Sequence, residues 1–260
     1  MTNSIITSTG SYLPSEIIPN EFFLRNEFYG SDGYKFSRPN ADIIKKLFEI
    51  TGIRERRYVT KELSTSDISY LAAEQALEGL DRESLDYIIV AQNFGDVQAD
   101  NIRTDMVPTI ASRVKHKLKI KNPYTIAFDI PFGCPGWLQA MITADYIIKS
   151  GDAKRILVIG AEILSRVSDP HDVDSMIYGD SAGATLLEAL EKSGSGQLKP
   201  AEQRKLEVVA NRATADEPDE RYPSADEFAT ALRRAARLRE REPEGEHAVL
   251  WPIVGIDTTS

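Results

Sequence analysis

The chain contains a single cysteine, Cys134, and its surroundings favour nucleophilic chemistry. The segment 128–140 reads Phe-Asp-Ile-Pro-Phe-Gly-Cys-Pro-Gly-Trp-Leu-Gln-Ala. A strand pattern ends there, a turn with Gly133 and Gly136 follows, and a helical pattern begins at once. A cysteine in such a turn is exposed at the positive end of a helix dipole, where a thiolate is stabilised. We therefore expect Cys134 to be a covalent nucleophile that accepts an acyl group from a thioester.

A purely structural role for Cys134 stays open at this point. A lone cysteine beside apolar residues is commonly a small buried hydrophobic side chain. The turn between strand and helix favours catalysis, and Pro135 suits the first helical position because its missing N–H is not needed there. With only one cysteine, the chain has no intrachain disulfide and no zinc site built from several cysteines, and we expect no metal.

The elements that must position Cys134 alternate between strand and helix patterns. Residues 4–12 open as a strand, and apolar runs predict further strands at 87–91, 124–130, 155–159 and 184–187. Helices are predicted at 41–50, after Ser64, at 106–118, and at 137–149 with Gly151 as its cap. This alternation predicts an α/β fold with a mostly parallel sheet covered by helices.

The pattern changes near residue 190. Residues 191–200 have the composition of a linker. Two helical patterns follow, and an apolar run at 247–256 adds a possible terminal strand. We therefore predict an α/β part over 1–190 and a short, mainly helical tail over 201–260.

Composition excludes several classes of function. The formal net charge of −9 argues against coating a nucleic acid or an anionic membrane, since either role needs a basic face. We find no signal-peptide pattern, and no apolar run reaches the roughly 20 residues of a membrane span. A lone cysteine fits a reducing compartment. We expect a cytoplasmic protein without a nucleic-acid or membrane partner.

Five segments, in the right order, resemble 3-oxoacyl-[acyl-carrier-protein] synthase III, a family with the thiolase-like fold. The similar segments are Thr51–Arg57 (Thr-Gly-Ile-Arg-Glu-Arg-Arg), Thr65–Asp67 with Ala72 and Ala73, the turn around Cys134, Gly160–Glu162, and Gly179–Ala184. The resemblance implies that residues 1–190 are the N-terminal half of such a fold.

The resemblance also implies a reaction. Cys134 would take an acyl group from acyl-CoA, and the acyl-enzyme would condense with a malonyl acyl carrier protein that loses CO₂, in fatty acid or related biosynthesis. Backbone N–H groups would stabilise the oxyanion. Acyl-CoA is then a substrate, no cofactor is expected, and acyl carrier protein and a second copy in a homodimer are the implied partners. A related thioester enzyme, such as a hydroxymethylglutaryl-CoA synthase, is a weaker alternative.

Several features depart from the family. Its catalytic His and Asn belong to a second half, which we do not find here; His116, His171 and His247 lie in other contexts. Ile50 stands where the family often has an arginine, and Ser181 replaces a turn glycine, which predicts backbone strain. We therefore expect impaired condensation. The alternative is a non-catalytic, truncated or chimeric protein that serves as a scaffold or partner-binding module.

Residues 201–235 resemble the last two helices of a bacterial serine/threonine protein kinase, most specifically at Arg221–Ser224. We find no glycine-rich loop, His-Arg-Asp loop, Asp-Phe-Gly or Ala-Pro-Glu motif, and these absences exclude kinase activity. A two-helix cap over exposed sheet is the alternative interpretation of this segment.

Overall fold

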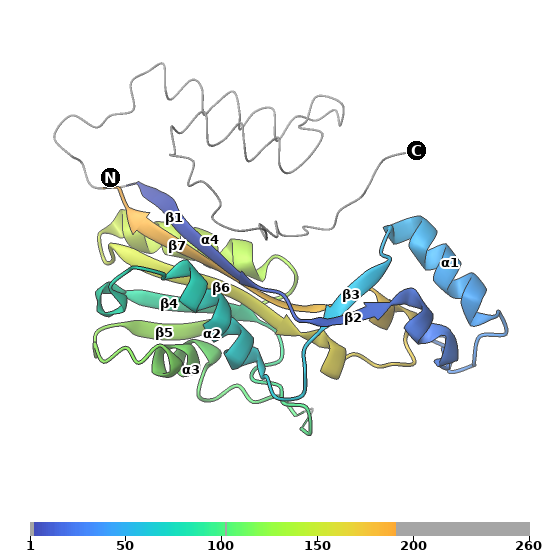
Figure 1. Cartoon of the computed structure of the whole chain (residues 1–260). Coiled ribbons are helices and arrows are strands. Elements are labelled where there is room, and N and C mark those ends of the chain that lie inside the picture. Colours follow the sequence, from blue (N-terminus) through green and yellow to red (C-terminus); the bar gives the residue numbers. More distant parts are fainter. Residues whose placement is uncertain (1–2, 102, 191–260) are drawn as a thin grey trace, which may run out of the picture. The chain divides into compact units, whose positions relative to one another are not determined.

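The computed structural model describes residues 3–101 and 103–190, and the structural statements below concern these residues. Four predictions lie outside them: the linker at 191–200, the helical tail at 201–260, its kinase-like segment at 201–235, and the context of His247. The described part holds the whole segment that carries the sequence motifs around Cys134, so the predicted α/β fold can be compared directly with the structure (Figure 1).

A five-stranded sheet forms the centre of the described part (Figure 1). In spatial order its strands are β1 (Ser4–Tyr12), β7 (Asp180–Ala189), β6 (Arg155–Ile163), β4 (Tyr87–Gln92) and β5 (Ile126–Pro131). Strand β4 is parallel to β5 and β6, whereas β7 is antiparallel to both β6 and β1. Within this sheet β7 is therefore the one strand whose direction is opposite to that of the other four. The predicted mostly parallel sheet of an α/β fold is confirmed.

Helices cover both faces of this sheet. Helices α2 (Thr65–Ala76) and α3 (Ile110–Lys117) pack on one face, and α4 (Gly136–Ser150) packs on the other (Figure 1). The predicted start of α2 is confirmed by a capping box between Ser64 and Asp67, and the predicted cap of α4 by Gly151 in a left-handed conformation. These layers are what βαβ crossovers produce.

The helix predicted at 106–118 begins later than expected. It starts at Ile110, because Pro108 provides no N–H and Thr109 caps the helix, accepting a hydrogen bond from the Ser112 N–H at its side-chain oxygen. The predicted helix at 41–50 is α1 (Asn40–Thr51), which ends at Gly52 in the left-handed conformation. The existence of each helix was thus predicted correctly, and the ends were decided by capping contacts.

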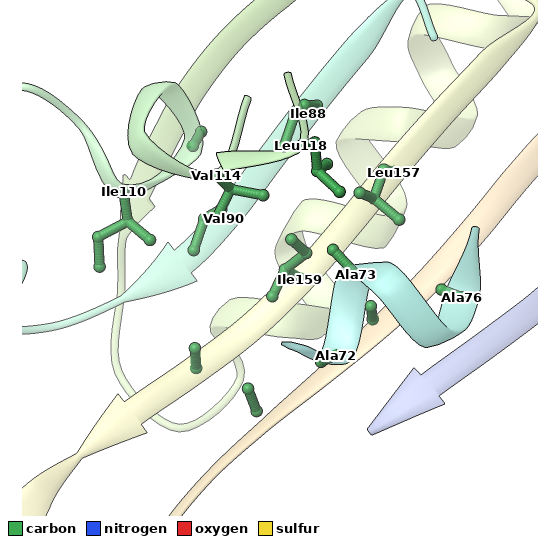
Figure 2. Packing of buried hydrophobic residues seen from close by; sticks show 14 of the residues in the cluster. Ala72, Ala73, Ala76, Ile88, Val90, Ile110, Val114, Leu118, Leu157 and Ile159 are labelled. Atoms are coloured by element: carbon green, nitrogen blue, oxygen red, sulfur yellow. The ribbon is translucent and has the colours of Figure 1, made fainter. Parts of the chain in front are cut away.

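Two hydrophobic clusters hold the layers together. Between the sheet and α2 and α3, the alanines of α2 and the branched side chains of α3 contact apolar residues of β4 and β6 (Figure 2). On the opposite face, Ala140, Ala144 and Ile148 of α4 contact Ile89, Ile156 and Val158. Each large apolar side chain that becomes fully buried contributes about 1.5–3 kcal/mol, so these clusters supply much of the stability of the described part.

Alternation along the strands assigns each residue to a face. In β6, Ile156 and Val158 belong to the α4 cluster, while Leu157 and Ile159 belong to the cluster of α2 and α3. Because successive side chains point to opposite faces, the later even-numbered residues of β6 share the face of α4. The carboxyl end of β6 therefore carries its Glu162 side chain on the face that also carries Cys134.

A smaller unit beside the sheet was missed by the sequence analysis. Strands β2 (Glu16–Pro19) and β3 (Glu55–Tyr58) pair antiparallel, and the 3-10 helix η1 (Asn20–Arg25) packs with α1. The buried guanidinium of Arg56 donates to the Asn20 side chain at 2.8 Å and lies over the Phe23 ring. The two strands have four residues each and are separated in the sequence by η1 and α1, so no local pattern predicts their pairing. The remaining short 3-10 turns are η2 (Arg82–Ser84), η3 (Leu164–Arg166) and η4 (Val173–Met176).

The contact between β1 and α2 predicts the effect of substituting Gly10. A Cβ atom at Gly10 would overlap the Ala72 carbonyl oxygen and lie 2.5 Å from the Ala76 backbone nitrogen. We expect Gly10→Ala to lower the free energy of unfolding by about 1–3 kcal/mol or more, measured by urea denaturation. Gly133→Ala is the control, since a Cβ there meets nothing within 4 Å, and its effect should stay below about 1 kcal/mol. Equal stability of the two variants would contradict this packing.

Candidate active site

Cys134 is exposed and lies in the turn that joins β5 to α4. The Gly136 N–H donates to the Gly133 carbonyl at 2.8 Å and closes this turn around the cysteine. The sequence pattern placed Pro135 at the first helical position. Helix α4 begins one residue later, at Gly136, so Pro135 is its N-cap residue. The exposed thiol therefore precedes the N-terminus of a helix of 15 residues, where the helix dipole favours negative charge.

Small residues let the start of α4 approach the sheet closely. A Cβ atom at Gly136 would lie 3.3 Å from the Ala91 Cβ of strand β4. A Cβ atom at Gly160 of strand β6 would lie 3.2 Å from the Trp137 Cβ. Both distances are tighter than most Cβ contacts in proteins, so a larger residue at Gly136 or Gly160 would require its neighbour to shift by a few tenths of an ångström. The position of Cys134 thus depends on two glycines: Gly136 lets α4 approach β4, and Gly160 lets Trp137 of α4 approach β6.

The carboxyl end of β4 is bonded to the strand that leads into the turn. The Phe132 N–H donates to the Gln92 carbonyl at 3.2 Å, two residues before Cys134. The Gln92 side chain is buried, accepts from the Gly95 N–H at 2.6 Å, and donates to Asp129 at 3.3 Å. This network holds the ends of β4 and β5 in register beside the turn that contains Cys134.

Asp129 on β5 extends this network to the other sheet face. Its carboxylate accepts the N–H groups of Ile110 and Ala111 at 2.7 and 2.8 Å, at the start of α3. Burial raises the pKa of Asp129, and the hydrogen bonds from these two N–H groups and from Gln92 oppose that shift. Asp129 therefore fixes α3 to the strand that carries the nucleophile turn.

Glu162 and Asn93 form a polar pair that the sequence analysis did not assign. The Asn93 backbone N–H and side-chain amide both donate to Glu162 Oε2, at 2.9 and 2.6 Å. Burial raises the pKa of Glu162, and the two bonds from Asn93 oppose this. The signals available in the sequence were the segment Gly160–Glu162 and the position of Asn93 directly after a predicted strand, but neither reveals the pairing across strands.

The start of β7 is held by a third carboxylate, that of Asp180. Asp180 accepts the Val59 N–H at 2.9 Å and the Ser165 hydroxyl at 2.6 Å. Burial raises the pKa of Asp180, and its hydrogen bonds oppose the shift. The strain predicted at Ser181 is wrong: Ser181 lies in β7, pairs with Glu162 of β6, and is not among the residues with positive φ. Extended backbone accepts any side chain, so the missing glycine costs nothing there.

None of the described histidines lies at the nucleophile turn. His116 is exposed on α3, which packs on the sheet face opposite α4. His171 is exposed in a turn, with its ring nitrogen 2.8 Å from the Glu27 carbonyl and its ring edge against Tyr29. Both placements match the local contexts expected from the sequence, a helix surface for His116 and a turn for His171. Ile50, which stands at the position of the family's arginine, is 72% exposed on α1.

A cleft of about 790 Å³ lies away from Cys134, between the N-terminus of α2, the residues after β4, and α3. Its lining includes Ser64, Asp96, Arg113 and His116, on the side of the sheet that α2 and α3 cover. Cys134 is not among the residues that line this cleft. Within residues 3–101 and 103–190, the structure brings no group of three potential metal-ligating side chains together, and no helix is both long and apolar enough to span a bilayer.

Comparison of this sequence with known proteins finds similarity to one family. Residues 128–202 match the family model of 3-oxoacyl-[acyl-carrier-protein (ACP)] synthase III, and this range includes the nucleophile turn. A beta-ketoacyl-[acyl-carrier-protein] synthase III 1 of Vibrio vulnificus (strain YJ016) is 37% identical over 202 residues, covering 74% of this chain and 54% of the relative. The corresponding synthase III of Ehrlichia canis (strain Jake) is 37% identical over 199 residues, covering 75% of this chain and 55% of the relative.

Solved structures agree with the sequence relatives. A 3-oxoacyl-(acyl-carrier protein) synthase from Burkholderia xenovorans LB400 superposes with a TM-score of 0.61 and 25% identity, covering 73% of this chain and 49% of that chain. These neighbours confirm the predicted thiolase-like fold. The chain spans about half the length of the curated relatives it matches. The kinase resemblance at 201–235 receives no support from these matches.

The burial of Glu162 predicts how stability depends on pH. Because its pKa is raised on folding, its contribution to the free energy of unfolding falls as the pH rises from the ordinary value of 4.5 through the raised value. Glutamine does not titrate. We therefore expect Glu162→Gln to gain stability relative to the parent as the pH rises toward neutrality, measured as the difference between their urea midpoints. A difference that is constant or falls with pH would contradict the raised pKa.

Proposed function

Because this chain is related to the 3-oxoacyl-[acyl-carrier-protein] synthase III family, we propose that it is an acyltransferase in which Cys134 accepts an acyl group from acyl-CoA. The observation that carries this proposal is the exposed thiol before the N-terminus of α4, in the segment that matches the family model. Acyl-CoA is a substrate here, and the proposal requires no cofactor or metal. The reaction belongs to fatty acid or related biosynthesis in the cytoplasm.

The proposed loading step uses the geometry of the turn directly. The Cys134 thiolate attacks the thioester carbonyl carbon, a new carbon–sulfur bond forms, and the bond to the CoA sulfur breaks. The CoA thiolate leaves and takes up a proton, so one thioester replaces another at little cost in free energy. The dipole of α4 stabilises the negative charge that starts on Cys134 and passes through the tetrahedral intermediate.

Condensation with a malonyl acyl carrier protein needs more than the described residues supply. Loss of CO₂ generates a carbanion, and in the family a His and an Asn donate hydrogen bonds to the developing enolate. The described His116 and His171 both lie elsewhere. We therefore propose that the described half loads an acyl group by itself but condenses it poorly without groups from a second half.

A partner-binding role is the second candidate, and the surface of α4 favours it. Leu138, Ile142 and Tyr146, spaced four residues apart, are 54%, 39% and 66% exposed. Trp137 and Phe132 add further exposed apolar area at the nucleophile turn. Such a stripe opposite the buried face of a helix is typical of a surface that another polypeptide covers. A scaffold or partner-binding module needs this surface but no reactive thiol.

The two candidate functions differ in the chemistry expected at Cys134. Incubation with acetyl-CoA should add the mass of one acetyl group to the parent chain and nothing to Cys134→Ala, as measured by intact mass spectrometry. Both proteins are first shown to be folded by circular dichroism. The absence of an adduct on the folded parent would exclude the acyltransferase and leave the partner-binding module.

We also propose that the chain forms a homodimer through the edge of β5. This strand pairs only with β4 in the described sheet; its first residue Ile126 is 48% exposed, and Tyr124, two residues before the strand, is 84% exposed. An unpaired edge with exposed apolar side chains favours pairing with a second copy.

Light scattering after gel filtration should give the mass of a dimer, and Ile126→Lys should shift the population toward the monomer because it places a charge on this edge. Ile50→Lys is the matched control, since Ile50 is 72% exposed but lies on α1. A monomeric parent, or equal effects of the two lysines, would exclude this interface.

A further inference from the structure

The strand ends beside the nucleophile turn carry Asn93 and Glu162 on the face of α4. In β6, Gly160 lies against Trp137 in the first turn of α4, and Glu162 follows two residues later on the same face. In β4, Ala91 belongs to the α4 cluster, and Asn93 follows it two residues later. Both polar residues therefore extend past the contact between helix and sheet, on the side where Cys134 lies.

One peptide group connects Glu162 to the segment that precedes Cys134. The peptide between Gln92 and Asn93 donates its N–H to Glu162 Oε2 at 2.9 Å and accepts the Phe132 N–H on its carbonyl oxygen at 3.2 Å. A trans peptide is planar, and its N–H and C=O point in opposite directions. Fixing the N–H toward β6 therefore fixes the carbonyl toward β5. The chain of contacts runs from Glu162 through one rigid unit to Phe132, two residues before the nucleophile.

The hydrogen bonds that the Glu162 carboxylate accepts from the end of β4 both come from Asn93. Oε2 accepts both N–H groups of Asn93, whereas Oε1 is buried and has no hydrogen-bond partner within the described residues. Burying an incompletely bonded carboxylate costs free energy, and an apolar side chain would fill the site without that cost. An apolar side chain would therefore stabilise this position more, which favours a role for Glu162 other than stability.

We propose that Glu162 is a positioning residue for Cys134. Its carboxylate holds the Gln92–Asn93 peptide in the orientation that binds Phe132, and this fixes the approach of the thiol to its acyl donor. The proposal rests on the proposed function, because it takes Cys134 as the reacting group. It assigns Glu162 no contact with the substrate.

The substitutions that test this role separate hydrogen bonding from packing. Glu162→Ala removes the acceptor, whereas Glu162→Gln keeps an oxygen that can accept both N–H groups of Asn93. Asn93→Ala removes one of the two bonds at an exposed residue, so it tests the proposal even if Glu162→Ala does not fold. The matched control is Asp96→Asn, which changes a buried carboxylate that accepts the Ser66 N–H at 2.7 Å on the opposite side of the sheet.

Two probes report on the single cysteine by intact mass. The first is acetylation by acetyl-CoA under single-turnover conditions. The second is alkylation by iodoacetamide, in which the sulfur–carbon bond forms as iodide leaves. We expect Glu162→Ala to lower the maximal acetylation rate about tenfold to a hundredfold, with the half-saturating acetyl-CoA concentration unchanged, because misplacing a reacting group by about 1 Å has effects of that size. Glu162→Gln and Asp96→Asn should stay within about threefold of the parent, Asn93→Ala should be intermediate, and alkylation should follow the same order.

Parental rates in Glu162→Ala would overturn the proposal. So would equally slow rates in Glu162→Ala and Glu162→Gln, since the retained acceptor would then have no effect. If Glu162→Ala does not fold, a parental rate in Asn93→Ala is the overturning result. Failure of the proposed function is distinguishable from these outcomes: the parent would then take no acetyl group, while the order of the alkylation rates would still test the positioning of Cys134.

Discussion

The close approach of α4 to strands β4 and β6 is the constraint on which the nucleophile turn depends. A Cβ atom at Gly136 would lie 3.3 Å from the Ala91 Cβ, and one at Gly160 would lie 3.2 Å from the Trp137 Cβ, so either substitution would force its neighbour to shift. The buried side of α4 then continues this contact through Ala140, with the rest of its apolar face along the sheet. Because the helix start is fixed in this way, Cys134, two residues before it, has a defined position although it is exposed. Backbone packing can therefore position an exposed side chain without burying it.

Polar contacts at the strand ends also help to fix the elements around the turn that contains Cys134. Gln92 and Asp129 join β4, β5 and α3, while Glu162 and Asn93 join β4 and β6. These bonds lie at the carboxyl ends of parallel strands, where backbone groups lack further ladder partners. Buried carboxylates with raised pKa values occur at this same end of the sheet, since burial outweighs their hydrogen bonds. The site thus combines a tightly packed helix start with a network that ties neighbouring strands together.

The outer surface of α4 is apolar but exposed. Leu138, Ile142 and Tyr146 are exposed on the helix whose other side is fully buried. The chain spans about half the length of its matched relatives. Its described residues present both an exposed thiol and an exposed apolar helix surface. The two proposed functions, acyl loading and partner binding, draw on these different parts of the surface, and for this reason a chemical assay at Cys134 separates them.

The sequence by itself determined the α/β class, the helices that flank the sheet, and Cys134 in its turn, because these follow from local patterns: apolar periodicity, capping residues, and glycines beside a lone cysteine. Only the tertiary structure decided the antiparallel direction of β7, the pairing of β2 with β3, and the relaxed extended backbone at Ser181. It also decided the contact between Asn93 and Glu162, which lie 69 residues apart. Such contacts depend on which strands become neighbours, and no short stretch of sequence contains that information.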